Sequence, residues 1–239
     1  MSIKKYIPDF ITSMNLLCGV IGVVFAFKGR FDLAFYLMLA GAVCDFCDGL
    51  VARLLGAYSD LGKELDSLAD LVSFGVLPSV MLYSLMKTFM FGENVFCWIP
   101  LLIAVFSGLR LAKFNVDTRQ HSSFLGLPTP ACAMLCASLT YFVCSEPGCF
   151  LATWIAGPVF IPMLSLILCA LLVCEIPMFS FKFSKDDSKS LKSKRIWYVA
   201  LLAVVAVCCL VCKLNWSLVV LLAIVIYILK NFIYFIARI

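Results

Sequence analysis

Hydrophobic residues in this chain are grouped into long blocks that short polar stretches separate. An α-helix rises about 1.5 Å per residue, so a block of roughly 17–25 apolar residues can cross the hydrocarbon core of a bilayer. About eight such blocks are present, at roughly 10–27, 33–52, 67–86, 95–112, 128–144, 151–174, 196–212 and 215–236. The pattern predicts an all-α fold, a polytopic membrane helix bundle with about eight transmembrane helices.

The amino-acid composition is that of a membrane protein. Of the 239 residues, 64% are hydrophobic, and the mean hydropathy is +1.06. An ordinary soluble domain is only about 45–50% apolar. The formal net charge is +5. A positively charged membrane protein is attracted to anionic lipid headgroups. Membrane lipid is therefore an expected partner, and nucleic acid is not.

Basic residues are divided unevenly between the two sides that the predicted helices define. If the N-terminus is cytoplasmic, 15 of the 19 basic residues face the cytoplasm, and the other 4 are Lys28, Arg30, Lys87 and Lys213. Cytoplasmic loops of membrane proteins carry an excess of Lys and Arg. We therefore expect a protein of the cytoplasmic (inner) membrane with both termini in the cytoplasm.

One polar stretch divides the chain. Residues 180–195 (SFKFSKDDSKSLKSKR) are basic and rich in serine, which is typical of a linker. We predict a six-helix membrane core at 1–179, a cytoplasmic linker at 180–195 and a C-terminal transmembrane helical pair at 196–239. The linker is interpreted as a solvated loop, with headgroup binding as the alternative.

The segment 45–70, DFCDGLVARLLGAYSDLGKELDSLAD, departs most strongly from the apolar pattern, with six of the 14 acidic residues. Asp45 and Asp48 are three residues apart, and Asp66 and Asp70 are four apart, so each pair lies on one face of a helix. Carboxylates at membrane depth are costly and indicate function. Four converging carboxylates would need cations among them, and hard ions such as Mg²⁺ or Mn²⁺ prefer oxygen ligands.

Neither structural salt bridges nor a transport path accounts well for this acidic segment. Salt bridges would need nearby bases, but only Arg53 and Lys63 are positive within 45–70. A cation or proton-coupled transporter would spread polar residues through both halves of the bundle. Here the acids are concentrated at one predicted end of the second and third helices. The segment is better interpreted as an active site that faces the cytoplasm.

The spacing of the segment is Asp45-x2-Asp48-Gly49-x2-Ala52-Arg53-x8-Gly62-x3-Asp66-x3-Asp70. This spacing resembles the signature of the CDP-alcohol phosphotransferase family, and every specified position is matched. The resemblance implies divalent metal ions, two in number, held by four ligands: Asp45, Asp48, Asp66 and Asp70. It also implies that Asp70 is the catalytic general base and that the protein forms a homodimer.

The same resemblance implies a binding pocket for the CDP-lipid, lined by Gly49, Ala52, Arg53, Ser59 and Gly62. The glycines and the alanine remove side-chain bulk beside the acids, and an arginine can pair with phosphate. Ser59 would add a hydroxyl group. In the family a Pro-Asn sequence before the first helix also lines the nucleotide site. This chain has Pro8-Asp9 at that place and departs from the family pattern at position 9.

A second polar segment, 108–131, indicates which alcohol accepts the transferred group. Its pieces Arg110-Leu-Ala-Lys113-Phe-Asn115 and Gly126-Leu-Pro128-Thr-Pro130 are similar to those of membrane-embedded phosphatidylserine synthases, a branch of that family. The resemblance, which covers about residues 6 to 135, implies transfer of the phosphatidyl group from CDP-diacylglycerol to L-serine. The serine carboxylate would need a cationic partner, and we expect Arg110 or Lys113 to supply it, with Asn115 as a polar neighbour. The alternative is another acceptor: glycerol 3-phosphate, an inositol phosphate or choline.

Overall fold

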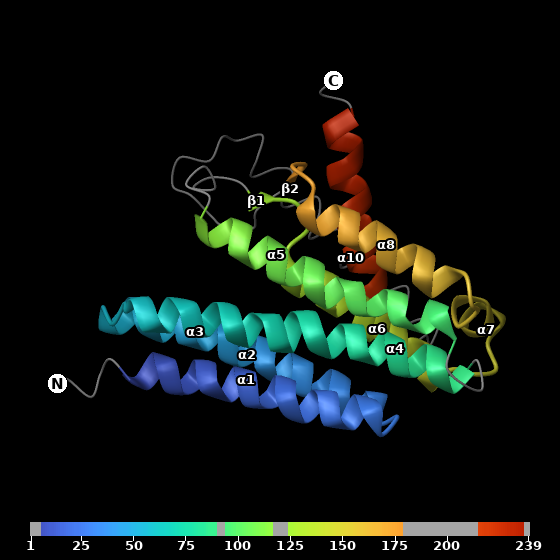
Figure 1. The fold of residues 1–239 in the computed structure, drawn as a ribbon, viewed down its shortest axis with the longest axis horizontal. Helices are drawn as coiled ribbons and strands as arrows, with labels where there is room; N and C mark the ends of the chain where they lie inside the picture. The colour runs from blue at the N-terminus through green and yellow to red at the C-terminus, as the bar shows by residue number, and fades with distance from the viewer. Residues whose placement is uncertain (1–5, 90–93, 117–123, 179–214, 237–239) are drawn as a thin grey trace.

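The computed structural model describes residues 6–89, 94–116, 124–178 and 215–236, which form a helix bundle (Figure 1). The predicted all-α membrane fold is confirmed. Five helical segments are long and apolar enough to cross a membrane: Tyr6–Phe27, Phe31–Leu55, Asp60–Phe89, Val95–Val116 and Trp216–Ile233. Two shorter apolar helices are Thr129–Ser145 and Phe160–Val173. The predicted linker 180–195 and the predicted helix 196–212 lie outside the described residues.

The first two helices form an antiparallel hairpin. Helices α1 (Tyr6–Phe27) and α2 (Phe31–Leu55) are joined by a turn in which Gly29 has a φ of 70°. Helix α2 ends at Gly56, whose φ of 60° is a left-handed conformation that glycine adopts without steric cost. The chain reverses there, so the acidic end of α2 lies beside the beginning of the next helix.

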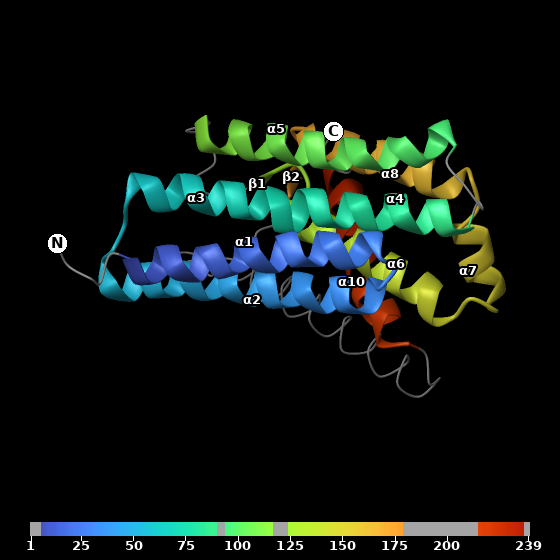
Figure 2. The same ribbon diagram turned by 60° about the horizontal axis from the view of Figure 1, so that its bottom comes forward.

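The third predicted transmembrane block is a continuous helical rod of three parts. These are α3 (Asp60–Asp70), a π-helical segment η2 (Leu71–Val76) and α4 (Leu77–Phe89). The rod extends beyond both ends of the predicted block at 67–86. Helix α4 packs against both α1 and α6 and is almost fully buried. In Figure 2 it lies between α1 and α5.

The next elements are η3 (Val95–Leu101, a 3₁₀ helix), α5 (Leu102–Val116), α6 (Thr129–Ser145), α7 (Phe150–Ile155) and α8 (Phe160–Val173). The strands β1 (Phe124–Leu125) and β2 (Pro177–Met178) form an antiparallel pair of two residues each. The single helix predicted at 151–174 is instead two helices, α7 and α8. The break contains Gly157 and Pro158; proline has no N–H group and disfavours a helical residue before it.

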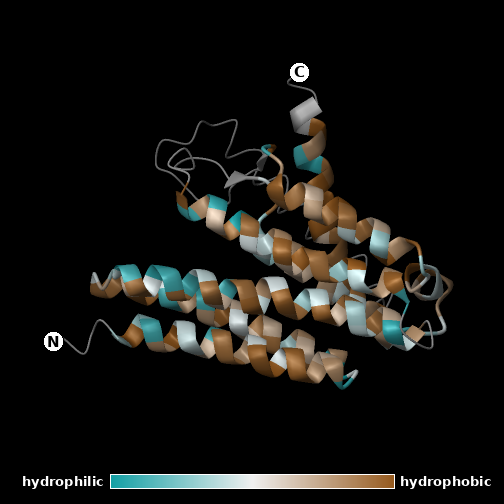
Figure 3. Ribbon diagram, viewed as in Figure 1, coloured by the Kyte–Doolittle hydropathy of each residue, from teal (hydrophilic) through white to brown (hydrophobic). Residues whose placement is uncertain are grey.

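The last described helix, α10 (Trp216–Ile236), packs against α6. Its first residue, Trp216, stacks on Phe35 and contacts Tyr141, each with ring centroids 5.3 Å apart. Figure 3 shows that the hydrophilic positions of α3 and α5 gather toward one end of the bundle, the end where the chain also begins α1. The candidate site lies at that end.

Candidate active site

Three aspartates from two neighbouring helices meet at the polar end of the bundle. Asp45 and Asp48 come from one face of α2, and Asp66 comes from α3. One carboxylate oxygen from each of the three lies within 4.8 Å of the other two. Asp48 is only 6% exposed. Because an isolated buried carboxylate is strongly unfavourable, this arrangement needs positive charge among the three groups.

Asp70 completes the acidic group. It lies one helical turn after Asp66, close enough to the other three aspartates for their charges to act on it. Oδ1 of Asp66 and Oδ1 of Asp70 are buried and accept no hydrogen bond from any described residue. Buried polar atoms are normally paired. These oxygens and the closely spaced carboxylates fit hard divalent cations, whose preferred ligands are oxygen atoms.

Thr12 of α1 supports this group, although the sequence did not single it out. Its hydroxyl donates a hydrogen bond of 2.6 Å to Oδ2 of Asp48. Thr12 is 3% exposed and belongs to a buried stripe of α1 that also contains Pro8, Asn15 and Gly19. These polar and small residues recur at helical spacing, but their spacing alone does not show which helix they meet.

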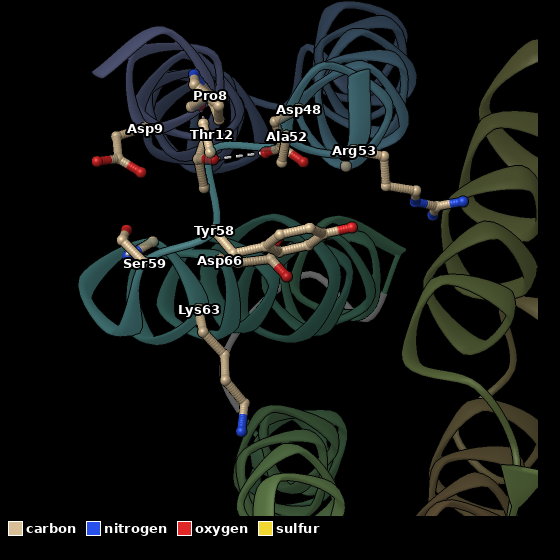
Figure 4. Close-up of a pocket in the computed structure, with 13 residues that line it drawn as sticks. Pro8, Asp9, Thr12, Asp48, Ala52, Arg53, Tyr58, Ser59, Lys63 and Asp66 are labelled. Carbon is tan, nitrogen blue, oxygen red and sulfur yellow. Dashed lines mark hydrogen bonds between the residues drawn. The ribbon is translucent and has the colours of Figure 1, made fainter. Parts of the chain in front are cut away.

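A pocket of about 270 Å³ opens beside the aspartates. Helix α1, helix α2, the turn after α2 and the beginning of α3 all contribute to it (Figure 4). Its lining residues are Pro8, Asp9, Thr12, Asp48, Gly49, Ala52, Arg53, Ala57, Tyr58, Ser59, Gly62, Lys63 and Asp66. The structure thus brings together all five residues predicted to bind the CDP-lipid. It adds residues of α1 and the Ala57–Tyr58 turn to them.

The two glycines of the pocket have different roles. At Gly49, an added Cβ would meet one described atom within 4 Å, Nη2 of Arg53 at 3.9 Å, so a methyl group would fit here without a clash. At Gly62, a Cβ would lie 2.7 Å from Oδ1 of Asp9 and 2.9 Å from Oγ of Ser59. Gly49 therefore provides room for a ligand, whereas Gly62 lets α1 and the turn approach α3 closely.

Polar side chains of the pocket point in different directions. In Figure 4, Asp9 and Arg53 lie on opposite sides, and Arg53 extends away from the aspartates. Ser59 caps α3, because its Oγ accepts a hydrogen bond of 2.9 Å from the N–H of Gly62. The Ser59 hydroxyl proton is still available to a ligand. The pocket therefore has an acidic side at Asp9 and a basic side at Arg53.

The residues predicted to bind serine are placed apart from one another. Arg110 is 8% exposed, and its Nη1 donates to Oγ1 of Thr129 over 3.1 Å. Its Nε is buried with no hydrogen-bond partner among the described residues. The charge of Asp70 acts on Arg110. Arg110 is therefore a buried cation near the fourth aspartate.

Lys113 and Asn115 connect α5 to other elements. Nζ of Lys113 forms an ion pair of 3.1 Å with Glu175, which follows α8. Nδ2 of Asn115 donates to Oγ of Ser67 on α3 over 2.9 Å. Neither is among the lining residues of the pocket. Ser67 lies between Asp66 and Asp70, so the Asn115 contact holds α5 against the acidic stretch of α3.

Comparison with known proteins agrees with this geometry. The family model for CDP-alcohol phosphatidyltransferase matches residues 5–171. The chain is 36% identical to CDP-diacylglycerol–serine O-phosphatidyltransferase of Bacillus subtilis over 137 residues, which is 57% of this chain and 76% of that protein. It is 33% identical to the Mycobacterium tuberculosis protein of the same name over 219 residues, 85% of this chain and 69% of that protein. It is also 34% identical to archaetidylserine synthase of Methanothermobacter thermautotrophicus over 134 residues, 55% and 56% of the two chains.

Proposed function

The chain belongs to the CDP-alcohol phosphatidyltransferase family, and on this premise we propose that it transfers the phosphatidyl group of CDP-diacylglycerol to the hydroxyl of L-serine. The products are phosphatidylserine and CMP. The observation that carries the proposal is the pocket whose lining includes Asp48 and Asp66 of the aspartate cluster together with the small residues Gly49 and Ala52. The names of the relatives from Bacillus and Mycobacterium support serine as the acceptor.

The metal site consists of Asp45, Asp48, Asp66 and Asp70. We propose that these residues hold two divalent ions, Mg²⁺ or Mn²⁺. When bound, the ions offset the negative charge of the diphosphate and of the transition state. The unpaired oxygens of Asp66 and Asp70 support this assignment, because they are buried acceptors in need of a cation.

The CDP portion of the lipid occupies the pocket, with its diphosphate beside Asp48 and Asp66 and its acyl tails in the bilayer. Gly49 supplies the space for close approach. Arg53 contributes positive charge at the rim, where a phosphate can pair with it. The acidic side at Asp9 repels phosphate and therefore faces the uncharged nucleoside, whose hydroxyl and amino groups can donate hydrogen bonds.

Asp70 acts as the general base. It accepts the proton of the serine hydroxyl, and the serine oxygen attacks the phosphorus that carries the diacylglycerol. The bond between that phosphorus and the CMP oxygen breaks, so CMP leaves with the electron pair. Arg110, a buried cation near Asp70, binds the serine carboxylate. Lys113 and Asn115 act more remotely, by holding α5 in place.

The location and assembly of the protein are part of this proposal. The distribution of basic residues supports an inner-membrane protein whose active site and termini face the cytoplasm, where soluble serine is available. Family membership supports a homodimer. We propose residues 1–179 as the catalytic core and 196–239 as a C-terminal addition to it, whose described helix α10 packs against α6.

The test uses the purified full-length chain in detergent or vesicles with CDP-diacylglycerol and a panel of alcohols: L-serine, glycerol 3-phosphate, an inositol phosphate and choline. We expect CMP release to depend on L-serine, to stop on chelation of divalent ions and to return with Mg²⁺ or Mn²⁺. CMP release with a different alcohol alone would retain the family chemistry and reject serine. No release with any alcohol would reject the proposal.

A further inference from the structure

A buried asparagine lies behind the acidic group. Asn15 of α1 has an exposed fraction of 0%, and neither its Nδ2 nor its Oδ1 has a hydrogen-bond partner among the described residues. Burying an amide without hydrogen bonds is energetically unfavourable. A fully buried amide with both polar atoms unpaired therefore points to a partner that it meets during function.

The backbone around Asn15 is held tightly. Oγ of Ser73 donates a hydrogen bond of 2.9 Å to the main-chain carbonyl of Asn15. Ser73 belongs to η2, the π-helical segment that begins directly after Asp70. Gly19, one turn further along α1, leaves room for this contact, since a Cβ there would lie 2.5 Å from Oγ of Ser73. The position of Asn15 is therefore coupled to the helical turn that follows Asp70.

The orientation of the Asn15 side chain is also restricted. A Cβ added at Gly41 of α2 would lie 2.8 Å from Oδ1 of Asn15. With Oδ1 against Gly41, Nδ2 occupies the other side of the amide. The Asn15 side chain also lies close to the Asp70 carboxylate, in a contact that does not reach ordinary hydrogen-bond geometry. The amide of Asn15 and the carboxylate of Asp70 are therefore neighbours.

We propose that Asn15 is a positioning residue for Asp70: its Nδ2 donates to one carboxylate oxygen and directs the other toward the acceptor hydroxyl. This inference rests on the proposed function, in which Asp70 is the general base. The π-helical segment places one extra residue in the turn after Asp70, a feature common at functional sites. Ser73 and Gly41 hold the amide so that its donor faces the base.

Three variants test the proposal in the full-length protein. Asn15→Leu keeps the branched shape of the side chain, and Asn15→Asp keeps its size; both lose the amide donor. Gly41→Ala displaces the amide without changing its chemistry. The matched control is Gly22→Ala on α1. An added Cβ there would meet the flexible Cδ2 of Leu77 at 2.7 Å, away from Asn15. All four proteins are compared with the wild type for kcat, for the KM of CDP-diacylglycerol and for Mn²⁺ affinity by paramagnetic resonance.

We expect the three test variants to lower kcat about 10- to 100-fold, while the KM for CDP-lipid and the Mn²⁺ affinity stay within about twofold of wild type. Gly22→Ala should retain kcat. Wild-type kcat in Asn15→Leu and Asn15→Asp would overturn the proposal. So would a loss of Mn²⁺ affinity that parallels the loss of kcat, because Asn15 would then support the metal.

Two controls separate a loss of the Asn15 role from misfolding and from failure of the proposed function. If Asn15→Leu is not recovered as a folded protein by gel filtration and thermal melting, Gly41→Ala decides the question, and an unchanged kcat in it overturns the proposal. If the wild type releases no CMP with any alcohol, the proposed function has failed. A wild type that is active beside fully active variants rejects only the role of Asn15.

Discussion

The Thr12 hydroxyl donates a 2.6 Å hydrogen bond to Oδ2 of Asp48, and this contact joins α1 to the aspartate motif of α2. Both side chains are buried, at 3% and 6% exposure. A hydrogen bond to an ionised carboxylate is shorter and stronger than one between neutral groups. Asp48 also belongs to the cluster with Asp45 and Asp66. Contacts of this kind hold metal ligands in place.

Replacement of Thr12 by valine, which has the same shape and no hydroxyl, should weaken divalent metal binding about 10- to 100-fold. Asp48 would lose the donor that orients it. Metal affinity is measured by Mn²⁺ titration of the purified protein. Ser13→Ala is the control, because the exposed Ser13 hydroxyl donates a hydrogen bond to the Asp9 carbonyl of its own helix. Equal Mn²⁺ affinities in Thr12→Val and wild type would contradict this role.

Gly49→Ala should raise the KM for CDP-diacylglycerol several-fold without lowering Tm. The new methyl group would enter open space in the pocket, and alanine stabilises a helix interior by up to about 1 kcal/mol relative to glycine. Steady-state kinetics and thermal melting separate the two effects. Gly148→Ala is the control, since a Cβ there meets nothing within 4 Å in the described part of the chain. An unchanged KM for CDP-diacylglycerol in Gly49→Ala would show that the nucleotide does not bind beside Gly49.

Arg110→Gln should raise the KM for L-serine about 10- to 100-fold and the KM for CDP-diacylglycerol much less, because charge-assisted hydrogen bonds contribute about 1.5–3 kcal/mol. Lys113→Gln provides the comparison. Its charge is paired with Glu175 at the surface, where such pairs contribute about 0–1 kcal/mol. Equal effects on the KM values of both substrates in Arg110→Gln would show a structural role for this residue only.

Asp70→Asn should reduce kcat about 10²- to 10⁴-fold, since an amide cannot accept the proton of the attacking hydroxyl. Binding of CDP-lipid should largely survive, because Asp70 is not among the residues that line the pocket. A CMP-release assay and equilibrium binding of the CDP-lipid measure the two quantities. Near-normal turnover in this variant would show that Asp70 is not the general base.

The five residues predicted to bind the CDP-lipid all line one pocket, and three of the four predicted metal ligands form one cluster. The pairing of aspartates within each helix follows from local rules, whereas the meeting of α2 with α3 is tertiary. Spacings of three and four residues place Asp45 beside Asp48, and Asp66 beside Asp70, on any helix. Side chains farther apart in sequence could not be placed in this way. Lys113 and Asn115 were grouped with Arg110 because they are near it in sequence, but their partners lie on other elements.

The sequence by itself determined the membrane bundle and the acidic motif, because the hydrocarbon core demands long apolar helices and because helical periodicity is local. Only the tertiary structure decided which face of the apolar helix α1 meets the motif, and so revealed Thr12 against Asp48 and Asn15 beside Asp70. The approach of α1 to α3 at Gly62 was likewise invisible in the sequence. Nearly every face of such a helix is apolar, so its orientation depends on how neighbouring helices pack around it.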